Sequence, residues 1–153
     1  MRNEEDKAEI ELGIFAQFWK KAGISVKAES VGKGDPKLGE PDIYCETNLG
    51  PRYFELTEAC APEFAAAITQ AQKSGEPNAV WGKDVSSDII RKKLKKTYRV
   101  DQPIDLVLYV NGRTALPDDV LVPQLMPWLQ NDLGPFNRIW LFGEDVQCIA
   151  GAC

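Results

Sequence analysis

Histidine is absent from the 153-residue sequence. Its absence excludes Ser-His-Asp hydrolases, Cys-His proteases, HExxH metalloproteases and every metal or proton-transfer site that depends on an imidazole. Any catalysis by this chain must therefore use carboxylates, lysine, tyrosine, cysteine or hydroxyl groups.

Cysteine is scarce, and the pattern of the cysteines does not indicate a metal site. No two of them have the CxxC spacing typical of zinc ligands, and the last pair is too isolated to form such a site. We expect free thiols, with Cys45 buried as a small hydrophobic side chain. The four positions are Cys45, Cys60, Cys148 and Cys153.

Long apolar runs are also missing. No run approaches the ~18 residues that a membrane-spanning helix needs. The N-terminal sequence Met-Arg-Asn-Glu-Glu-Asp-Lys is too acidic for a signal or transit peptide. We therefore expect no membrane partner and a reduced, cytoplasmic location.

Positive charge is in the minority, since 18 Lys and Arg face 23 Asp and Glu, for a net charge of −5. This balance argues against a broad surface that coats nucleic acid, but it leaves room for a local basic groove. The composition, 44% hydrophobic and 27% charged, is typical of a globular chain. Residues 1–153 are enough for a single domain whose core needs neither metal nor disulfide.

Hydrophobic periodicity predicts the order of helices and strands. Helices are expected over residues 4–22, 62–73, 86–98 and 117–133. Strands are expected over residues 24–31, 42–47, 52–58, 104–110 and 138–142, with a last edge strand over 146–149. Residues 32–39 are expected to form a loop, and residues 48–51 a hairpin turn. The order predicts an α/β fold with a mixed sheet of about five strands and helices on both faces.

The first predicted helix carries an acid on its apolar face. When Phe15 is set at the centre of that face, a step of 100° per residue brings Glu11 within about 60° of it. Glu9 falls on the opposite, solvent-facing side. Glu11 is therefore the acid that this helix directs toward the interior.

Two further acids lie on the predicted hairpin, Asp42 after Pro41 and Glu55 on the partner strand. Because side chains alternate along a strand, Asp42 shares a face with Tyr44, and Glu55 shares one with Thr57. Acids on neighbouring strands can converge on one point. Mg²⁺ and similar hard cations take oxygen ligands, often only one or two carboxylates with water and substrate phosphate. The hairpin therefore predicts a divalent-cation site.

At these residues the chain resembles the PD-(D/E)xK nuclease superfamily, which has the restriction-endonuclease-like fold. Pro41-Asp42 matches the Pro-Asp element, Glu55 matches the Glu of Glu-x-Lys, and Glu11 matches the glutamate of the N-terminal helix. The element order matches over most of the chain. The resemblance implies metal-dependent hydrolysis of phosphodiesters in DNA, with Asp42 and Glu55 binding Mg²⁺ or Mn²⁺. It also implies that Glu11 orients a second ion or the water.

One position departs from the family pattern, because Thr57 stands where the family has its lysine. Thr57 can donate a hydrogen bond but carries no charge. Some members of the superfamily supply the basic residue from a following helix. On the predicted helix 86–98, Lys93 lies about 60° from Ile90 at the centre of the apolar face. Lys93 is therefore the expected replacement, with Thr57 as a minor donor.

The same helix provides the only dense group of basic residues in the sequence, with six in the nine positions 91–99. Such a group is the expected phosphate-binding patch of an acidic protein. The helical wheel turns Lys92, Lys95 and Lys96 away from the apolar face. DNA is the expected partner, with RNA, a homodimer and a larger protein partner left open. The expected phosphate contacts are Arg91, Lys92, Lys95, Lys96 and Arg99.

Each of these features also has a plainer interpretation. Glu11 could be a surface acid at the border of the apolar face, Asp42 a turn residue, and Glu55 a solvent-facing residue of an edge strand. A basic run is often just a solvated helix face. The missing lysine at position 57 and the acidic composition favour a rival function, a nuclease fold without cleavage that binds nucleic acid or protein. A purely structural oligomer subunit is a third alternative.

Overall fold

The computed structural model describes residues 4–58, 90, 92–109, 122–123, 125–126, 129, 133–143 and 145–153. The predicted helix 62–73, Cys60 and Arg91 lie outside these ranges, as do the first residues of the predicted helix 86–98 and most of 117–133. The described elements define an α/β fold with a six-stranded mixed sheet. Among the described residues, no helix is long and apolar enough to cross a membrane.

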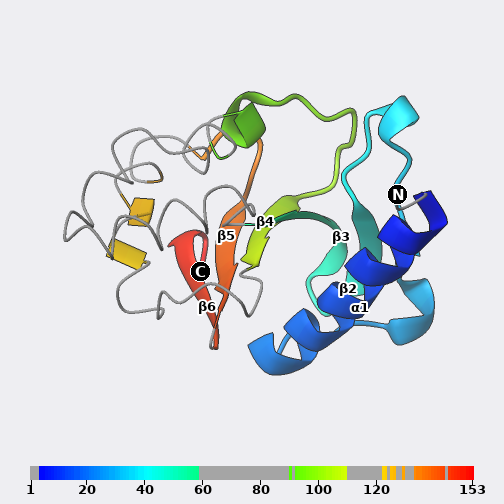
Figure 1. Ribbon diagram of the computed structural model, residues 1–153, viewed down its shortest axis with the longest axis horizontal. Helices are drawn as coiled ribbons and strands as arrows, with labels where there is room; N and C mark the ends of the chain where they lie inside the picture. Colours follow the sequence, from blue (N-terminus) through cyan, green and yellow to red (C-terminus); the bar gives the residue numbers. More distant parts are fainter. Residues whose placement is uncertain are drawn as a thin grey trace, which may run out of the picture.

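The sheet has the strand order β1-β2-β3-β4-β5-β6, which is also the order of the chain (Figure 1). The pairs β3–β4 and β4–β5 are parallel, and the other three pairs are antiparallel. About five strands were expected, and the described sheet has six, with β1 in a region expected to be a loop. The strands are β1 (Gly32–Lys33), β2 (Ile43–Thr47), β3 (Gly50–Glu58), β4 (Ile104–Tyr109), β5 (Arg138–Phe142) and β6 (Val146–Gly151).

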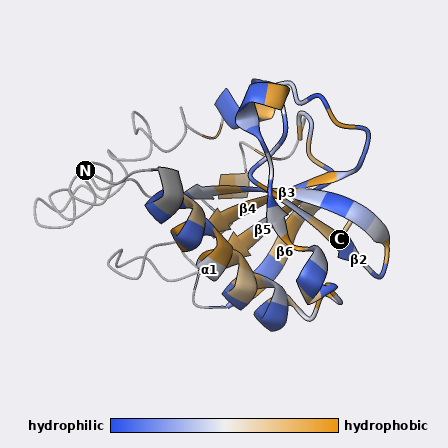
Figure 2. Ribbon diagram, turned by 90° about the vertical axis from the view of Figure 1, so that its right-hand side faces the viewer, coloured by the Kyte–Doolittle hydropathy of each residue, from blue (hydrophilic) through white to orange (hydrophobic). Residues whose placement is uncertain are grey.

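The helix α1 (Glu4–Ala22) packs along one face of the sheet (Figures 1 and 2). Phe15 and Phe18 are fully buried and contact Phe54 of β3, with the rings of Phe15 and Phe54 centred 4.9 Å apart. The predicted apolar face of this helix is therefore confirmed. Burial of these aromatic rings gives the helix its place, because each removes a large apolar area from water.

The opposite face of the sheet has its own apolar cluster, in which Leu106 and Leu108 of β4 are fully buried. Ile90 and Tyr98 cover this face from the segment that precedes β4. Val107 of the same strand belongs to the cluster under α1. The prediction that β4 is a central strand buried on both faces is therefore confirmed.

The prediction of a strand over residues 24–31 is wrong. Only Val26 pairs, in an isolated bridge with Thr47, and a short 3-10 helix, η1 (Ala28–Ser30), follows. The Ser30 hydroxyl donates to the carbonyl of Lys27 at 2.6 Å, so a local side-chain bond closes the turn where a strand would continue.

The region 32–39, expected to be only a loop, contains β1 and a second 3-10 helix, η2 (Pro36–Leu38). Gly34 allows β1 to approach β2, since a Cβ atom at this position would lie 1.9 Å from the carbonyl oxygen of Pro41. Its amide donates to the carbonyl of Asp42 at 2.9 Å. Only glycine fits here, and its presence ties the loop to the start of β2.

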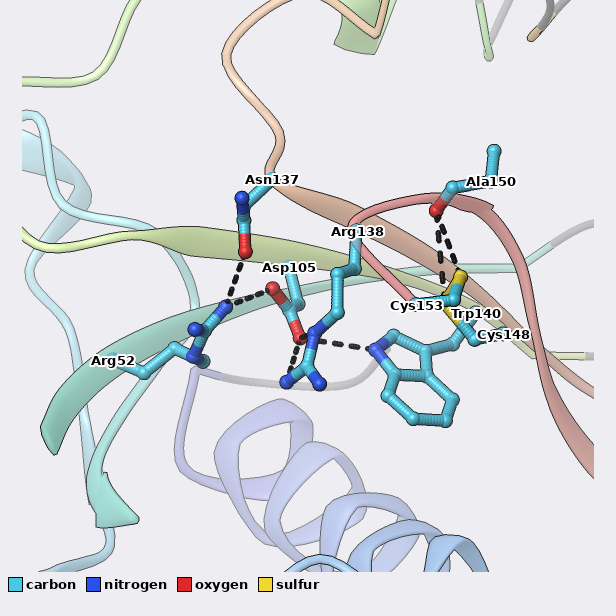
Figure 3. The surroundings of a disulfide bond; sticks show 8 residues. All are labelled: Arg52, Asp105, Asn137, Arg138, Trp140, Cys148, Ala150 and Cys153. Atoms are coloured by element: carbon cyan, nitrogen blue, oxygen red, sulfur yellow. Dashed lines mark hydrogen bonds and ion pairs between the residues drawn. A yellow bond between two sulfur atoms is a disulfide. The ribbon is translucent and has the colours of Figure 1, made fainter. Parts of the chain in front are cut away.

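A buried polar cluster joins the three central strands on the face that α1 covers (Figure 3). Asp105 of β4 is fully buried and accepts from Arg52 Nη1 at 2.6 Å, from Arg138 Nε and Nη2 at 2.7 Å and from Trp140 Nε1 at 2.9 Å. Asn137 Oδ1 accepts a further bond from Arg52 at 3.0 Å. Both oxygens of Asp105 therefore have donors, and the cluster is structural.

The expectation of free thiols is wrong for Cys148 and Cys153, which form a disulfide with a Cα–Cα separation of 5.7 Å (Figure 3). Gly151 has φ 92°, which turns the chain after β6, and the Ala152 amide donates to the carbonyl of Asn137 at 3.1 Å. This turn brings Cys153 back to Cys148. Cys45 is free and buried, as expected.

Candidate carboxylate–lysine site

Asp42 and Glu55 lie beside each other at the start of β2. The antiparallel register that pairs Ile43 with Phe54 puts Asp42 opposite Glu55. The Asp42 amide donates to Glu55 Oε1 at 3.0 Å, and the Leu56 amide donates to Asp42 Oδ2 at 2.9 Å. The hairpin thus brings the two predicted acids together through its backbone.

Lys93 reaches this pair from the helical residues 92–95. Its Nζ lies 2.7 Å from Glu55 Oε2, and the Glu55 side chain is 2% exposed. The helical face assigned to Lys93 from the sequence is the one that brings its ammonium to the carboxylates. The charge-assisted contact is short, as expected for an ammonium and a carboxylate in a site with little water.

One further donor and a second ammonium reach Glu55 from the residues that follow the helix. The Tyr98 hydroxyl donates to Glu55 Oε2 at 2.8 Å, and Lys96 Nζ lies 3.8 Å from the same oxygen. The prediction that Lys96 points away is wrong, because the helix ends at residue 95 and not at 98. Beyond that point a helical wheel no longer describes where side chains lie.

Glu11 approaches the pair from the other face of the sheet. It is 8% exposed, and its Oε1 accepts from Lys33 Nζ at 2.9 Å, whereas Glu9 is exposed. Glu55 projects from the face opposite α1, since its neighbours Phe54 and Leu56 pack with that helix. The three acids therefore do not share one face. Asp42 is the residue on which the charges of Glu11 and Glu55 both act.

The electrostatics of the pair are uneven. Burial, followed by the charge of Glu55, raises the pKa of Asp42 from 3.8 to about 7, against the Leu56 amide and Lys33, which lower it. Burial also acts to raise the pKa of Glu55, but the hydrogen bond and charge of Lys93 and the Tyr98 hydroxyl outweigh it, so this pKa is lowered. Glu55 is the permanent anion, and Asp42 changes charge near neutral pH.

Thr57 is buried at 6% exposure, two residues beyond Glu55 on the same face of β3. In the part of the chain that the structure describes, its Oγ1 has no hydrogen-bond partner. A buried hydroxyl without a partner is costly, and it retains a donor for a group that enters the site. Among the described residues, Thr57 therefore retains an unused hydrogen-bond donor on this face.

The remaining basic residues lie at the surface around the site. Lys92, Lys95 and Arg99 are exposed. The Arg99 amide donates to the carbonyl of Gly39 at 2.8 Å, and its side chain lies against that glycine. This contact joins the segment after the helix to η2.

The described residues contain no group of three or more His, Cys, Asp or Glu arranged to hold a metal ion. Glu11, the third acid of the expected set, is paired with Lys33. Asp42 and Glu55 still suit a hard cation that takes two carboxylates and completes its shell with water and phosphate. The Asp42 and Glu55 side chains also face each other through a hydrogen bond, so an ion held between them would take the place of that proton.

Sequence reasoning missed Lys33 and Tyr98 as members of this cluster. Lys33 stands in a region expected to be a loop, and Tyr98 at the end of a helix that stops earlier than expected. A hollow of about 700 Å³ lies elsewhere, between the end of α1 and the tip of the β2–β3 hairpin, where Trp19 and Pro51 line it. It contains none of the predicted catalytic residues.

Comparisons of the chain with protein-family models, curated proteins and solved structures found no match. The class of the protein rests on its own geometry: an α/β protein with a carboxylate–lysine cluster where β2 and β3 meet the segment before β4.

Proposed function

We propose that this chain is a metal-dependent nuclease that hydrolyses phosphodiester bonds in DNA, in a site of the PD-(D/E)xK type. The observation that supports this most is the Lys93 ammonium, 2.7 Å from Oε2 of Glu55, whose Oε1 accepts from the Asp42 amide. An ammonium held on the carboxylate that neighbours Asp42 supplies the basic group that Thr57 cannot.

The fold is compatible with this proposal. An N-terminal helix bears Glu11, a hairpin bears Asp42 and Glu55, and a helical segment and a parallel strand follow. A restriction-endonuclease-like fold has the same order of elements, and we propose that this domain belongs to it.

In the proposed mechanism, Asp42 and Glu55 hold Mg²⁺ or Mn²⁺. Such an ion lowers the pKa of bound water and neutralises charge that develops on the phosphate. Lys93 stabilises the same developing charge, and the Thr57 hydroxyl, which has no partner among the described residues, donates a hydrogen bond in the site. Glu11 acts through Asp42 rather than as an isolated ligand, because its own carboxylate is paired with Lys33.

The surface lysines have a different task. Lys92, Lys95 and Arg99 contact phosphates of the backbone, and such contacts weaken as salt is added. They supply affinity without sequence preference, whereas the buried cluster supplies the chemistry.

Incubation with single- and double-stranded DNA, with Mg²⁺, Mn²⁺ or EDTA, tests the proposal. Lys93→Ala is expected to lower kcat by ~10²–10³, because a preorganised cation at the reacting charge is removed. The matched variant Lys92→Ala, one position away and exposed, is expected to raise KM at higher salt with little effect on kcat. Equal kcat values for the two variants would contradict the assignment of Lys93.

The second candidate is a nuclease-fold domain without cleavage, which binds nucleic acid or protein. Thr57 at the lysine position favours it, as do the lysine partners already present on Glu11 and Glu55. This protein would bind DNA equally well in Mn²⁺ and in EDTA and would cut it in neither. The same gel-shift and cleavage series therefore separates the two functions.

A further inference from the structure

The two oxygens of the Glu55 carboxylate have different surroundings. Oε2 accepts from Lys93 Nζ at 2.7 Å and from the Tyr98 hydroxyl at 2.8 Å. Oε1 accepts from the Asp42 amide at 3.0 Å. Each carboxylate oxygen has two lone pairs, so Oε2 is fully used by Lys93 and Tyr98, and the second lone pair of Oε1 faces the Asp42 side chain, where a cation shared by the two acids would bind.

Tyr98 is the rigid member of this group. Its side chain is 8% exposed and belongs to the apolar cluster beneath β4. Its ring centre lies 6.0 Å from that of Phe136. The Lys96 ammonium lies over the Tyr98 ring, 5.0 Å from the ring centre. Lys93, by contrast, is 27% exposed on a flexible four-carbon chain. The hydroxyl is therefore the donor whose position the core determines.

We propose that Tyr98 is a positioning residue, which keeps the Glu55 carboxylate turned so that Oε2 stays with Lys93 and Oε1 faces the cation position shared with Asp42. This inference rests on the proposed nuclease function. It assigns a role to a tyrosine that no sequence pattern singled out.

The physical reason lies in the rotation of the carboxylate about its last bond. A half-turn would only exchange two equivalent oxygens, so what the two donors on Oε2 and the one on Oε1 determine is the plane of the carboxylate. Without the hydroxyl, this plane can turn until the ammonium of Lys93 contacts both oxygens. The ammonium then competes with the cation for Oε1, because one lone pair cannot serve both.

The test compares Tyr98→Phe with the matched variant Tyr53→Phe. Tyr53 is also 8% exposed, and its hydroxyl also donates to a carboxylate, Glu40 Oε2 at 3.2 Å, outside the proposed site. Isothermal titration with Mn²⁺ and cleavage kinetics on duplex DNA are measured for both variants and the wild type. Circular dichroism checks the fold, and an osmolyte that stabilises folded states allows the comparison if either variant is weakened.

Tyr98→Phe is expected to weaken Mn²⁺ binding and lower kcat by about 10- to 100-fold, as for other partners of metal ligands, with KM for DNA unchanged. Tyr53→Phe is expected to match the wild type in both. If the two variants behave alike while the wild type binds Mn²⁺ and cleaves, the positioning role is overturned and the nuclease proposal stands. A wild type that neither binds Mn²⁺ nor cleaves DNA overturns both.

Discussion

Replacing Asp42 by Asn should stabilise the protein at alkaline pH and leave it unchanged at acid pH. Burial and the charge of Glu55 raise the pKa of Asp42 from 3.8 to about 7 in the folded state. The folded state therefore retains a proton that the unfolded chain loses near its ordinary pKa. Stability linked to Asp42 is complete below pH 3.8 and is lost as the pH rises through about 7.

The size of the effect follows from the two pKa values. A shift of the Asp42 pKa from 3.8 to about 7 corresponds to about 4 kcal/mol. The free energy of unfolding of the wild type falls by this amount between acid and alkaline pH. Asn resembles the protonated form, since its carbonyl can still accept from the Leu56 amide and its NH₂ can donate toward Glu55. We expect the free energy of unfolding of Asp42→Asn to exceed that of the wild type by about 1–4 kcal/mol at pH 8 and by less than about 0.5 kcal/mol at pH 4.

Urea denaturation at pH 4 and pH 8, in EDTA, measures this difference. Asp101→Asn is the control, because Asp101 is exposed, and its substitution should change stability by less than about 0.5 kcal/mol at either pH. A difference between wild type and Asp42→Asn that is the same at both pH values would refute the reasoning. Adding Mn²⁺ to about 100 times its Kd should raise the free energy of unfolding of the wild type by about 2.7 kcal/mol at pH 8. The same addition should raise that of the variant by much less.

Three more outcomes are expected. Asp105→Ala should lower the free energy of unfolding by about 3–5 kcal/mol in urea, because it leaves two buried guanidinium groups without their carboxylate. Glu11→Gln should lower cleavage and Mn²⁺ affinity, whereas Glu9→Gln should change neither, since only Glu11 is buried near Asp42. Replacing Cys148 and Cys153 together by Ser should cost about 2 kcal/mol of stability, which dithiothreitol should reproduce in the wild type.

The parts of the site that could be predicted from the sequence depend on regular periods. A strand alternates with period two, so the pairing of Asp42 with Glu55 followed from the hairpin alone. A helix turns 100° per residue, so the inward side of α1 and the position of Lys93 could also be found. In each case one period extends over the whole stretch that the inference uses.

The predictions that were wrong concern residues where a helix or strand ends and its periodicity no longer applies. Residues 24–31 alternate as a strand does, yet only Val26 pairs, and the chain then turns through η1. Lys96 and Tyr98 reach Glu55 because the helix has already ended at residue 95. Lys33 reaches Glu11 because Gly34 allows a close approach to Pro41. These contacts depend on where the chain turns in three dimensions, which local patterns do not specify.

Charge balance could have indicated that lysines pair with the buried acids of the site. Three acids directed toward the interior cannot all remain ionised there without cations, because burying an unpaired carboxylate costs far more than a protein gains from one contact. Two of them have a lysine at hydrogen-bond distance, Lys33 for Glu11 and Lys93 for Glu55. Among the described residues no lysine pairs in this way with Asp42, and its pKa is the one that rises to about 7. Asp42 is therefore the acid whose ionisation an added divalent cation would favour most, and the pH dependence of the unfolding free energy in wild type and Asp42→Asn reports that ionisation.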